Sequence, residues 1–108
     1  MNTTVHPRWR SVLHVHARPG RIDELRALFE TEPIFIAAME VGCRGTELLV
    51  GTEELVVLAE WDEPSDYQSW VESPVRARWG PAIDALSDTR HGDIYCLVSV
   101  PGPQTDDR

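Results

Sequence analysis

The sequence of 108 residues contains no lysine, so all ten of its basic residues are arginines. A chain without lysine has no side-chain amine that could form a Schiff base, which excludes that class of enzyme. Positive charge is scarce as well, because 18 acidic residues give a formal net charge of −8 at pH 7. Nucleic acid binding needs a basic surface, so we do not expect nucleic acid as a partner.

Cysteine is rare, with only Cys43 and Cys96 far apart in the sequence. Without a C-x-x-C spacing, the pair is typical of reduced, buried thiols rather than of a disulfide framework or a zinc site. The sequence also contains no metal-ligand spacing, glycine-rich phosphate loop or nucleophile elbow. We therefore expect no metal site.

Long apolar runs are missing too. No run approaches the roughly 20 residues that cross a bilayer. The first residues have no charged region followed by an apolar one, so they do not resemble a signal peptide. These features predict a cytoplasmic protein with no membrane partner.

The residues that are present predict one small globular domain, since 42% are hydrophobic and 26% are charged. We place the domain at residues 9–100. Residues 1–8 are short and polar and predict a flexible lead-in, and residues 101–108 are polar with two prolines and predict a disordered tail. A chain this short has little core to spare, which favours association with a partner.

Hydrophobic periodicity predicts strands and helices in the order β-α-β-β-α-β. Strands are expected at residues 9–17, 46–50, 55–61 and 94–100. Pro33 should end the first helix, which restarts at residues 34–40. After a helix at residues 65–72, Pro74 opens another that Gly80-Pro81 bends or interrupts, and residues 91–93 should form a turn.

This order is the ferredoxin-like split βαβ, an α+β fold with an antiparallel four-stranded sheet and helices on one face. The other face of the sheet is then left bare. Residues 55–61 are apolar on both faces, so a second copy would cover that bare face. We therefore expect a homodimer.

The chemistry is expected where the third strand passes into its helix, within residues 55–70. Trp61 ends an apolar run there, and a strand end beside a helix start gives a cleft with rigid walls. The alternative is that Trp61 only fills the end of the core.

Three stretches resemble the antibiotic biosynthesis monooxygenase (ABM) superfamily. They are VLHVHARPGRIDEL at residues 12–25, VGCRGTELLVG at residues 41–51 and LVVLAEWDEPSDYQSWVESPVR at residues 55–76. The resemblance covers residues 11–100. It implies a dimeric α+β barrel in which each subunit has a pocket between its sheet and its helices.

Members of this superfamily include cofactor-independent monooxygenases and cyclases that act on aromatic polyketide intermediates, and also haem-degrading enzymes. Trp61 matches the strand tryptophan of the oxygenases. The oxygenase and haem branches add an Asn on the first strand, and the haem branch adds a His in a later helix; the corresponding positions here hold Leu13 and Gly80. Haem degradation is therefore not expected, and any proton transfer must come from other groups.

His14 and His16 are the first candidates for a catalytic base or for polarising a carbonyl, together with Trp61, because histidine titrates near neutral pH. Alternatively, the two histidines lie in the dimer interface or bind backbone carbonyls. Arg76, or Arg78 beside it, could hold a substrate oxygen. Four aromatic residues could stack on a flat substrate, although core packing also explains them: Tyr67, Trp70, Trp79 and Tyr95.

The resemblance and these residues together favour a cofactor-free monooxygenase that uses O2 on an aromatic polyketide intermediate of antibiotic or other secondary-metabolite biosynthesis. A polyketide cyclase starts from the same enolate and is the alternative. A non-catalytic dimeric binding protein of the same fold is the third hypothesis. The residues leave open which substrate is bound and which of His14 and His16 faces the pocket.

Overall fold

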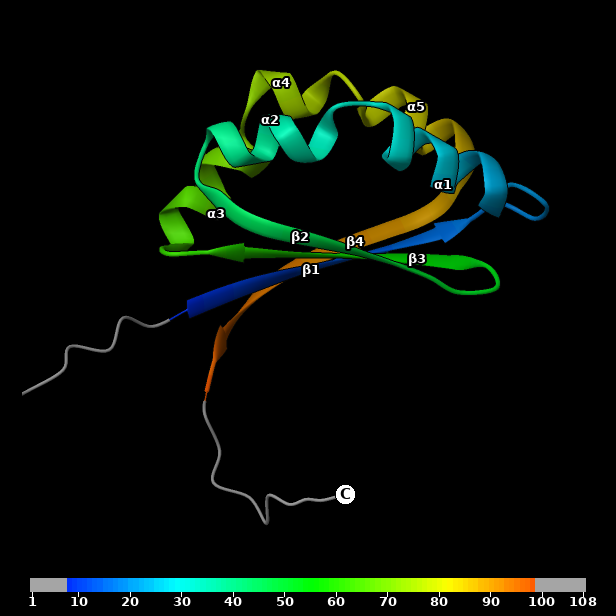
Figure 1. The fold of residues 1–108 in the computed structure, drawn as a ribbon. Coiled ribbons are helices and arrows are strands. Elements are labelled where there is room, and N and C mark those ends of the chain that lie inside the picture. Colours follow the sequence, from blue (N-terminus) through cyan, green and yellow to red (C-terminus); the bar gives the residue numbers. More distant parts are fainter. Residues whose placement is uncertain (1–7, 99–108) are drawn as a thin grey trace, which may run out of the picture.

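The structure is a computed structural model that describes residues 8–98. It contains a four-stranded sheet and five helices, all of which cover one face of the sheet (Figure 1). The elements in chain order are β1 (Arg8–Ala17), α1 (Ile22–Thr31), α2 (Ile34–Glu40), β2 (Cys43–Val50), β3 (Glu54–Trp61), α3 (Pro64–Val71), α4 (Pro74–Ala77), α5 (Gly80–Leu86) and β4 (Ser87–Leu97). The predicted tail, most of the lead-in and the last two residues of the predicted fourth strand lie outside the described residues.

All strand pairs are antiparallel, and the strand order is β2-β3-β1-β4. The prediction of a ferredoxin-like α+β fold is therefore confirmed. No helix within residues 8–98 combines the length and the apolar character that a membrane span requires.

The core lies between the sheet and the helices, because burial alternates strictly along β3 and in part along β1. In β3, every second residue is buried, from Leu55 to Trp61. In β1, the buried residues Ser11, Val15 and Ala17 lie on the same side of the sheet. A period of two sends alternate side chains to opposite faces, so the odd-numbered residues of both strands meet the helices.

Proline and glycine divide the helices as expected. The first helix ends before Pro33, where Glu32 is extended, and α2 begins at Ile34. Ser73 caps α4 by accepting a hydrogen bond from the backbone N–H of Val75 at 3.1 Å. Arg78 and Trp79 separate α4 from α5, and Gly80-Pro81, where a bend or interruption was expected, form the first two residues of α5.

The predicted turn at residues 91–93 is wrong, because these residues continue β4. His91 pairs with His14 and Gly92 pairs with Leu13. The ten-residue strand β1 offers backbone partners along its whole length, and this pairing outweighs the turn preference of a Gly-Asp sequence. The second strand also begins earlier than predicted, at Cys43.

The two cysteines are free, but they differ in exposure. Cys43 is buried, as predicted, whereas Cys96 is exposed. The prediction of a buried thiol is wrong for Cys96 because the last part of β4 extends past the area that the helices cover (Figure 1).

Candidate active site

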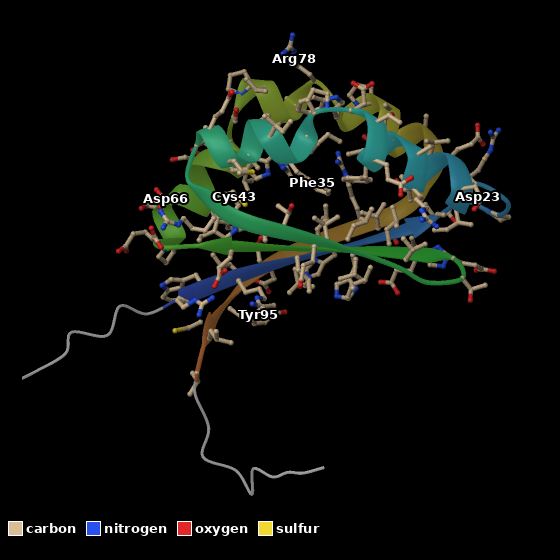
Figure 2. The ribbon with its side chains drawn as sticks, viewed as in Figure 1. Asp23, Phe35, Cys43, Asp66, Arg78 and Tyr95 are labelled. Carbon is tan, nitrogen blue, oxygen red and sulfur yellow. The ribbon has the colours of Figure 1, made fainter. Side chains whose placement is uncertain are left out.

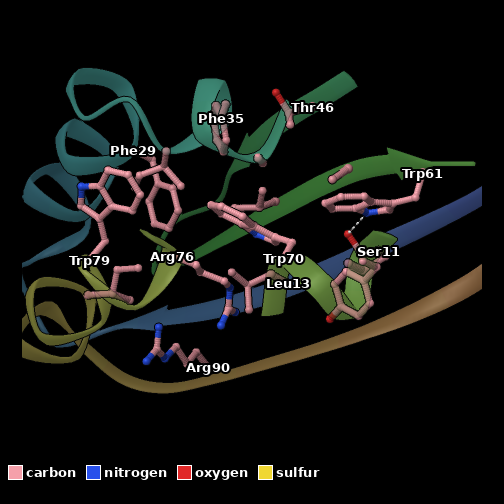
Figure 3. Close-up of a pocket in the computed structure, with 17 residues that line it drawn as sticks. Ser11, Leu13, Phe29, Phe35, Thr46, Trp61, Trp70, Arg76, Trp79 and Arg90 are labelled. Carbon is pink, nitrogen blue, oxygen red and sulfur yellow. Dashed lines mark hydrogen bonds between the residues drawn. The ribbon is translucent and has the colours of Figure 1, made fainter. Parts of the chain in front are cut away.

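A pocket lies between the helix-covered face of the sheet and the helices, and 17 residues line it (Figure 3). Its volume is about 60 Å³, which is room for roughly four to six ordered water molecules. Its walls are mostly apolar, and six aromatic residues contribute to them: Phe29, Phe35, Trp61, Tyr67, Trp70 and Trp79. A ligand with fused rings needs more room, so wall side chains must move when such a ligand binds.

Trp61 closes one end of this pocket. Its side chain is 1% exposed, and its indole N–H donates a hydrogen bond to the buried Ser11 hydroxyl at 2.9 Å. Tyr67 contacts the indole edge to face, with ring centroids 5.7 Å apart. Because the N–H already has a partner, Trp61 presents its ring surface to a ligand rather than a free donor.

The helix that follows β3 supplies the next two walls. Pro64 starts α3 only three residues after Trp61, and Tyr67 and Trp70 are three residues apart on that helix. Side chains with this spacing share one helix face, which here faces the sheet. As expected, β3 leads directly into a helix that carries aromatic side chains, and this junction forms one side of the pocket.

The Tyr67 hydroxyl reaches the neighbouring strand at a glycine. A Cβ atom at Gly92 would lie 3.2 Å from this hydroxyl, so the absence of a side chain there leaves room for the tyrosine. Burial raises the pKa of Tyr67 above its usual value, Arg76 opposes this shift, and Asp93 adds to it. The phenol is therefore neutral at physiological pH.

Two arginines lie near each other toward the other end of the pocket (Figure 3). Arg76 comes from α4, and its Nη1 donates a long hydrogen bond of 3.5 Å to the Val71 carbonyl. Arg90 comes from β4 and forms an ion pair with Asp84 at 3.2 Å. Burial lowers the pKa of Arg76, and the nearby Arg90 lowers it further. Arg76 nevertheless remains charged, because arginine starts from so high a pKa.

The lining of the pocket contains no histidine, aspartate or glutamate among the described residues. The arginines are therefore its only charged groups, although the whole chain carries a net charge of −8. The pocket offers positive charge and aromatic surface, but no carboxylate or imidazole that could serve as a base.

The structure brings together five of the eight residues predicted for the site. Trp61, Tyr67, Trp70, Arg76 and Trp79 all line the pocket. Trp79 also reaches the outside, because its indole N–H donates to Glu32 at 3.0 Å and its ring borders a shallow depression on the helical surface.

The other three predicted residues, His14, His16 and Tyr95, lie on the opposite face of the sheet. His14 Nδ1 is 2.6 Å from a carboxylate oxygen of Glu54, and both side chains are exposed. Tyr95 pairs with Arg10 and lies below the sheet in Figure 2.

These three residues, which the sequence suggested for the site, therefore do not line the pocket beside Trp61. The physical reason is the two-residue period of β1, which turns Ser11 and Leu13 toward the helices and both histidines away from them.

Two residues of the site were missed in the sequence. Ser11 shares the core face of β1 with Leu13 and Val15, so a hydroxyl among apolar residues was a usable signal. Arg90 gave no such signal, because a turn was expected immediately after it.

The position that holds a histidine in the haem-degrading branch does not fit an iron ligand here. Gly80 has no side chain, and a Cβ atom there would lie 3.6 Å from the Arg90 guanidinium. A cation at this distance opposes binding of a positively charged metal. No group of three or more metal-ligating side chains occurs in residues 8–98.

A model of the antibiotic biosynthesis monooxygenase family matches residues 10–81, two thirds of the chain. A protein of unknown function from Nitrosomonas europaea has a similar structure, with a TM-score of 0.73 at 15% identity over 93% of this chain and 98% of that one. A putative antibiotic biosynthesis monooxygenase from Chloroflexus aurantiacus has a TM-score of 0.63 at 16% identity over 88% and 97% of the two chains.

No curated protein sequence matches the chain. The structural neighbours share its fold at low identity, whereas the family model matches the sequence itself over both the first strand and the Trp61 junction. The chain therefore belongs to the antibiotic biosynthesis monooxygenase family.

Proposed function

We propose that this protein is a monooxygenase that oxidises an enolisable aromatic molecule with O2 and needs no metal, flavin or haem. The observation that carries the proposal is the pocket itself, where aromatic rings surround a space that ends at the buried Trp61. Its apolar, aromatic walls suit a flat ring, and the family that its sequence matches is named for monooxygenases. An aromatic polyketide intermediate is the substrate class that the family name favours.

In such a reaction the substrate is its own reductant. Loss of a proton from an anthrone gives an enolate, which passes an electron to O2 to form a radical pair. Recombination gives a peroxide, which loses water to leave a quinone. One oxygen atom enters the product and the other enters water, and the oxidised carbon supplies all the electrons.

The pocket contributes orientation and exclusion of water to these steps. Trp70 and Trp61 hold the ring between them, and the apolar walls keep water from the radical pair. The arginines at the other end fix the position of the substrate oxygen.

The test is O2 consumption by the purified, metal-free protein with an anthrone or a naphthol, and the mass of the product. We expect consumption above the spontaneous rate and a product that has gained one oxygen atom and lost two hydrogen atoms. A rate equal to the buffer control would refute the oxygenase.

A cyclase that closes a ring by aldol addition is the second candidate. Leu13 stands where the oxygenases carry an asparagine, and an arginine pair can polarise the carbonyl that an enolate attacks. The product mass separates the two reactions, because a cyclase leaves the mass unchanged or removes water. A pocket that binds aromatic ligands without converting them would support the non-catalytic binding protein instead.

We also propose that the protein forms a homodimer through the face of the sheet that the helices leave open. Val12 lies beside Leu58 on this face, and Val56 lies beside Leu49, which is 51% exposed. Tyr95 adds an aromatic ring that is 54% exposed. Apolar groups on an open sheet face are stabilised when a second sheet covers them.

The two free thiols support a reducing compartment, and we propose the cytoplasm. Detection of the unmodified thiols in protein isolated from cells under alkylating conditions tests this location.

A further inference from the structure

The charge around the pocket is opposite to the charge of the molecule. The chain has 18 acidic residues and ten basic ones, but the pocket lining contains Arg76 and Arg90 and none of the acidic residues. Figure 3 shows that both side chains reach the same end of the pocket, from α4 and from β4. A helix and a strand thus both bring positive charge to the same part of an apolar site.

Arg76 has little to neutralise it. Its guanidinium makes one long hydrogen bond, to the Val71 carbonyl, and within residues 8–98 no carboxylate oxygen lies within 4.0 Å of it. The neighbouring Arg90 is also a cation, so the two groups repel each other in apolar surroundings. Such an arrangement is unfavourable when empty and becomes favourable when an anion lies between the two cations.

The charges match a ligand with a single negative charge. Asp84 pairs with Arg90 at 3.2 Å and offsets one of the two positive charges, although its side chain is 64% exposed. One uncompensated positive charge therefore remains at this end of the pocket. The rest of the wall is mostly apolar and includes six aromatic side chains, so a ligand whose anionic atom is attached to an aromatic ring fits it best.

The same lining has no group that could remove a proton from a ligand. No histidine, aspartate or glutamate is among the residues that surround the pocket, and the neutral Tyr67 phenol is a weak base. Yet the proposed reaction begins from an enolate or a phenolate. The anion must then form by ionisation of the ligand itself.

We propose that the pocket binds its substrate as an oxyanion, in which Arg76 and Arg90 hold the ionised oxygen of a phenol or enol and so replace a protein base. The O–H bond breaks, its proton goes to solvent, and the electron pair stays on the oxygen between the two guanidinium groups. No oxidant is needed for this step. The inference concerns the substrate class of the proposed oxygenase, but it is tested without O2 or turnover.

The probe is 4-nitrophenol, a single ring whose phenol and phenolate forms absorb at different wavelengths. We expect its bound form to be the phenolate at pH values where the free compound is mostly neutral, with the pKa of the bound phenol lowered by about 1 to 3 units. Nitrobenzene, which cannot ionise, measures how much binding comes from the aromatic walls alone.

Arg76→Gln should remove most of the spectral shift and weaken phenolate binding about tenfold or more, while leaving nitrobenzene binding unchanged. Arg76→Lys keeps the charge and should retain part of the shift. The matched control is Arg78→Gln, because Arg78 lies two residues away on the outer surface of the helices and its loss changes the net charge equally (Figure 2). Circular dichroism of each variant verifies folding, and Arg90→Gln repeats the test with the arginine from β4.

The proposal is overturned if the wild-type protein binds 4-nitrophenol in its neutral form, or if Arg78→Gln reduces the shift as much as Arg76→Gln. Binding of 4-nitrobenzoate while nitrophenol stays neutral would also overturn it, because the anion would then be a carboxylate substituent. A normal spectral shift without O2 consumption would instead refute the oxygenase and leave this inference standing.

Discussion

The hydrogen bond between Trp61 and Ser11 fixes the residue on which the pocket depends. Both partners are buried, so the indole N–H has little access to water if the hydroxyl is lost. An unsatisfied buried donor costs about 1 to 3 kcal/mol. Ser11 thus fixes the position of the Trp61 ring and contributes to the free energy of unfolding.

Ser11→Ala should lower the free energy of unfolding by about 1 to 3 kcal/mol, measured by urea denaturation. Trp61→Phe removes the donor, so the same serine substitution in that background should cost much less. Equal costs in the two backgrounds would contradict a coupled pair.

Among individual residues, the sequence correctly predicted those whose direction toward the core follows from the periodicity of their own strand or helix. Trp61, Tyr67, Trp70, Arg76 and Trp79 follow one another through a strand and its helices, and all reach the pocket. The chemistry of His14 and His16 suggests a base, but both alternate with the apolar residues of β1 and so belong to the opposite face.

At the scale of the elements, Gly42 and Gly20 have positive φ angles at junctions of the chain, whereas Gly45 does not. Gly42 joins α2 to β2 with φ at +115°, and a Cβ atom there would lie 3.1 Å from the Asp66 side chain. Gly20 has φ at +76° with nothing within 4 Å, and Gly45 has neither a positive φ nor a neighbour within 4 Å. A left-handed backbone conformation disfavours any residue with a Cβ atom.

Substitution by alanine should therefore destabilise the protein in a graded order. Gly42→Ala should cost the most, since strain and close contact add, and we expect more than 2 kcal/mol. Gly20→Ala should cost about 1 kcal/mol, and Gly45→Ala should cost the least. Thermal or urea denaturation gives the order, and an equal loss for Gly42 and Gly45 would contradict it.

Gly92 allows a close contact of another kind, between β4 and α3. A Cβ atom there would lie 3.2 Å from the Tyr67 hydroxyl and 3.5 Å from Leu13, so a larger side chain must displace the tyrosine. Gly92→Val should weaken binding of 4-nitrophenol several-fold by moving this wall. Tyr67→Phe removes the crowded oxygen and should restore part of the affinity, and failure of that rescue would argue against this contact.

The order of elements could be predicted from the sequence because each strand and helix carries its own periodicity and its own proline or glycine signal. The length of β4 could not, because residues 91–93 are held in the sheet by pairing with β1, which is distant in the chain. Arg90 was missed as a pocket residue for the same reason, because the face on which a side chain lies can be predicted only when its strand is recognised.

For the whole molecule, the open face of the sheet determines assembly. If a second copy covers it, a charge placed among its apolar side chains should separate the two copies. Leu58→Glu should therefore convert a dimer into a monomer, measured by light scattering during gel filtration. Ile36→Glu makes the same change on the helical side, where Ile36 is 63% exposed, and should leave the mass unchanged. A monomeric wild-type protein would refute the dimer.

The pocket and the open face lie on opposite sides of one sheet. Apart from Val12, whose side chain belongs to the open face, the residues that line the pocket come from the helices or from the side of the strands that the helices cover. Two such chambers, placed back to back, would fill and empty independently of each other. Ligand titrations should then follow a single hyperbola with a Hill coefficient of about one, and a protomer released from its mate should keep its affinity.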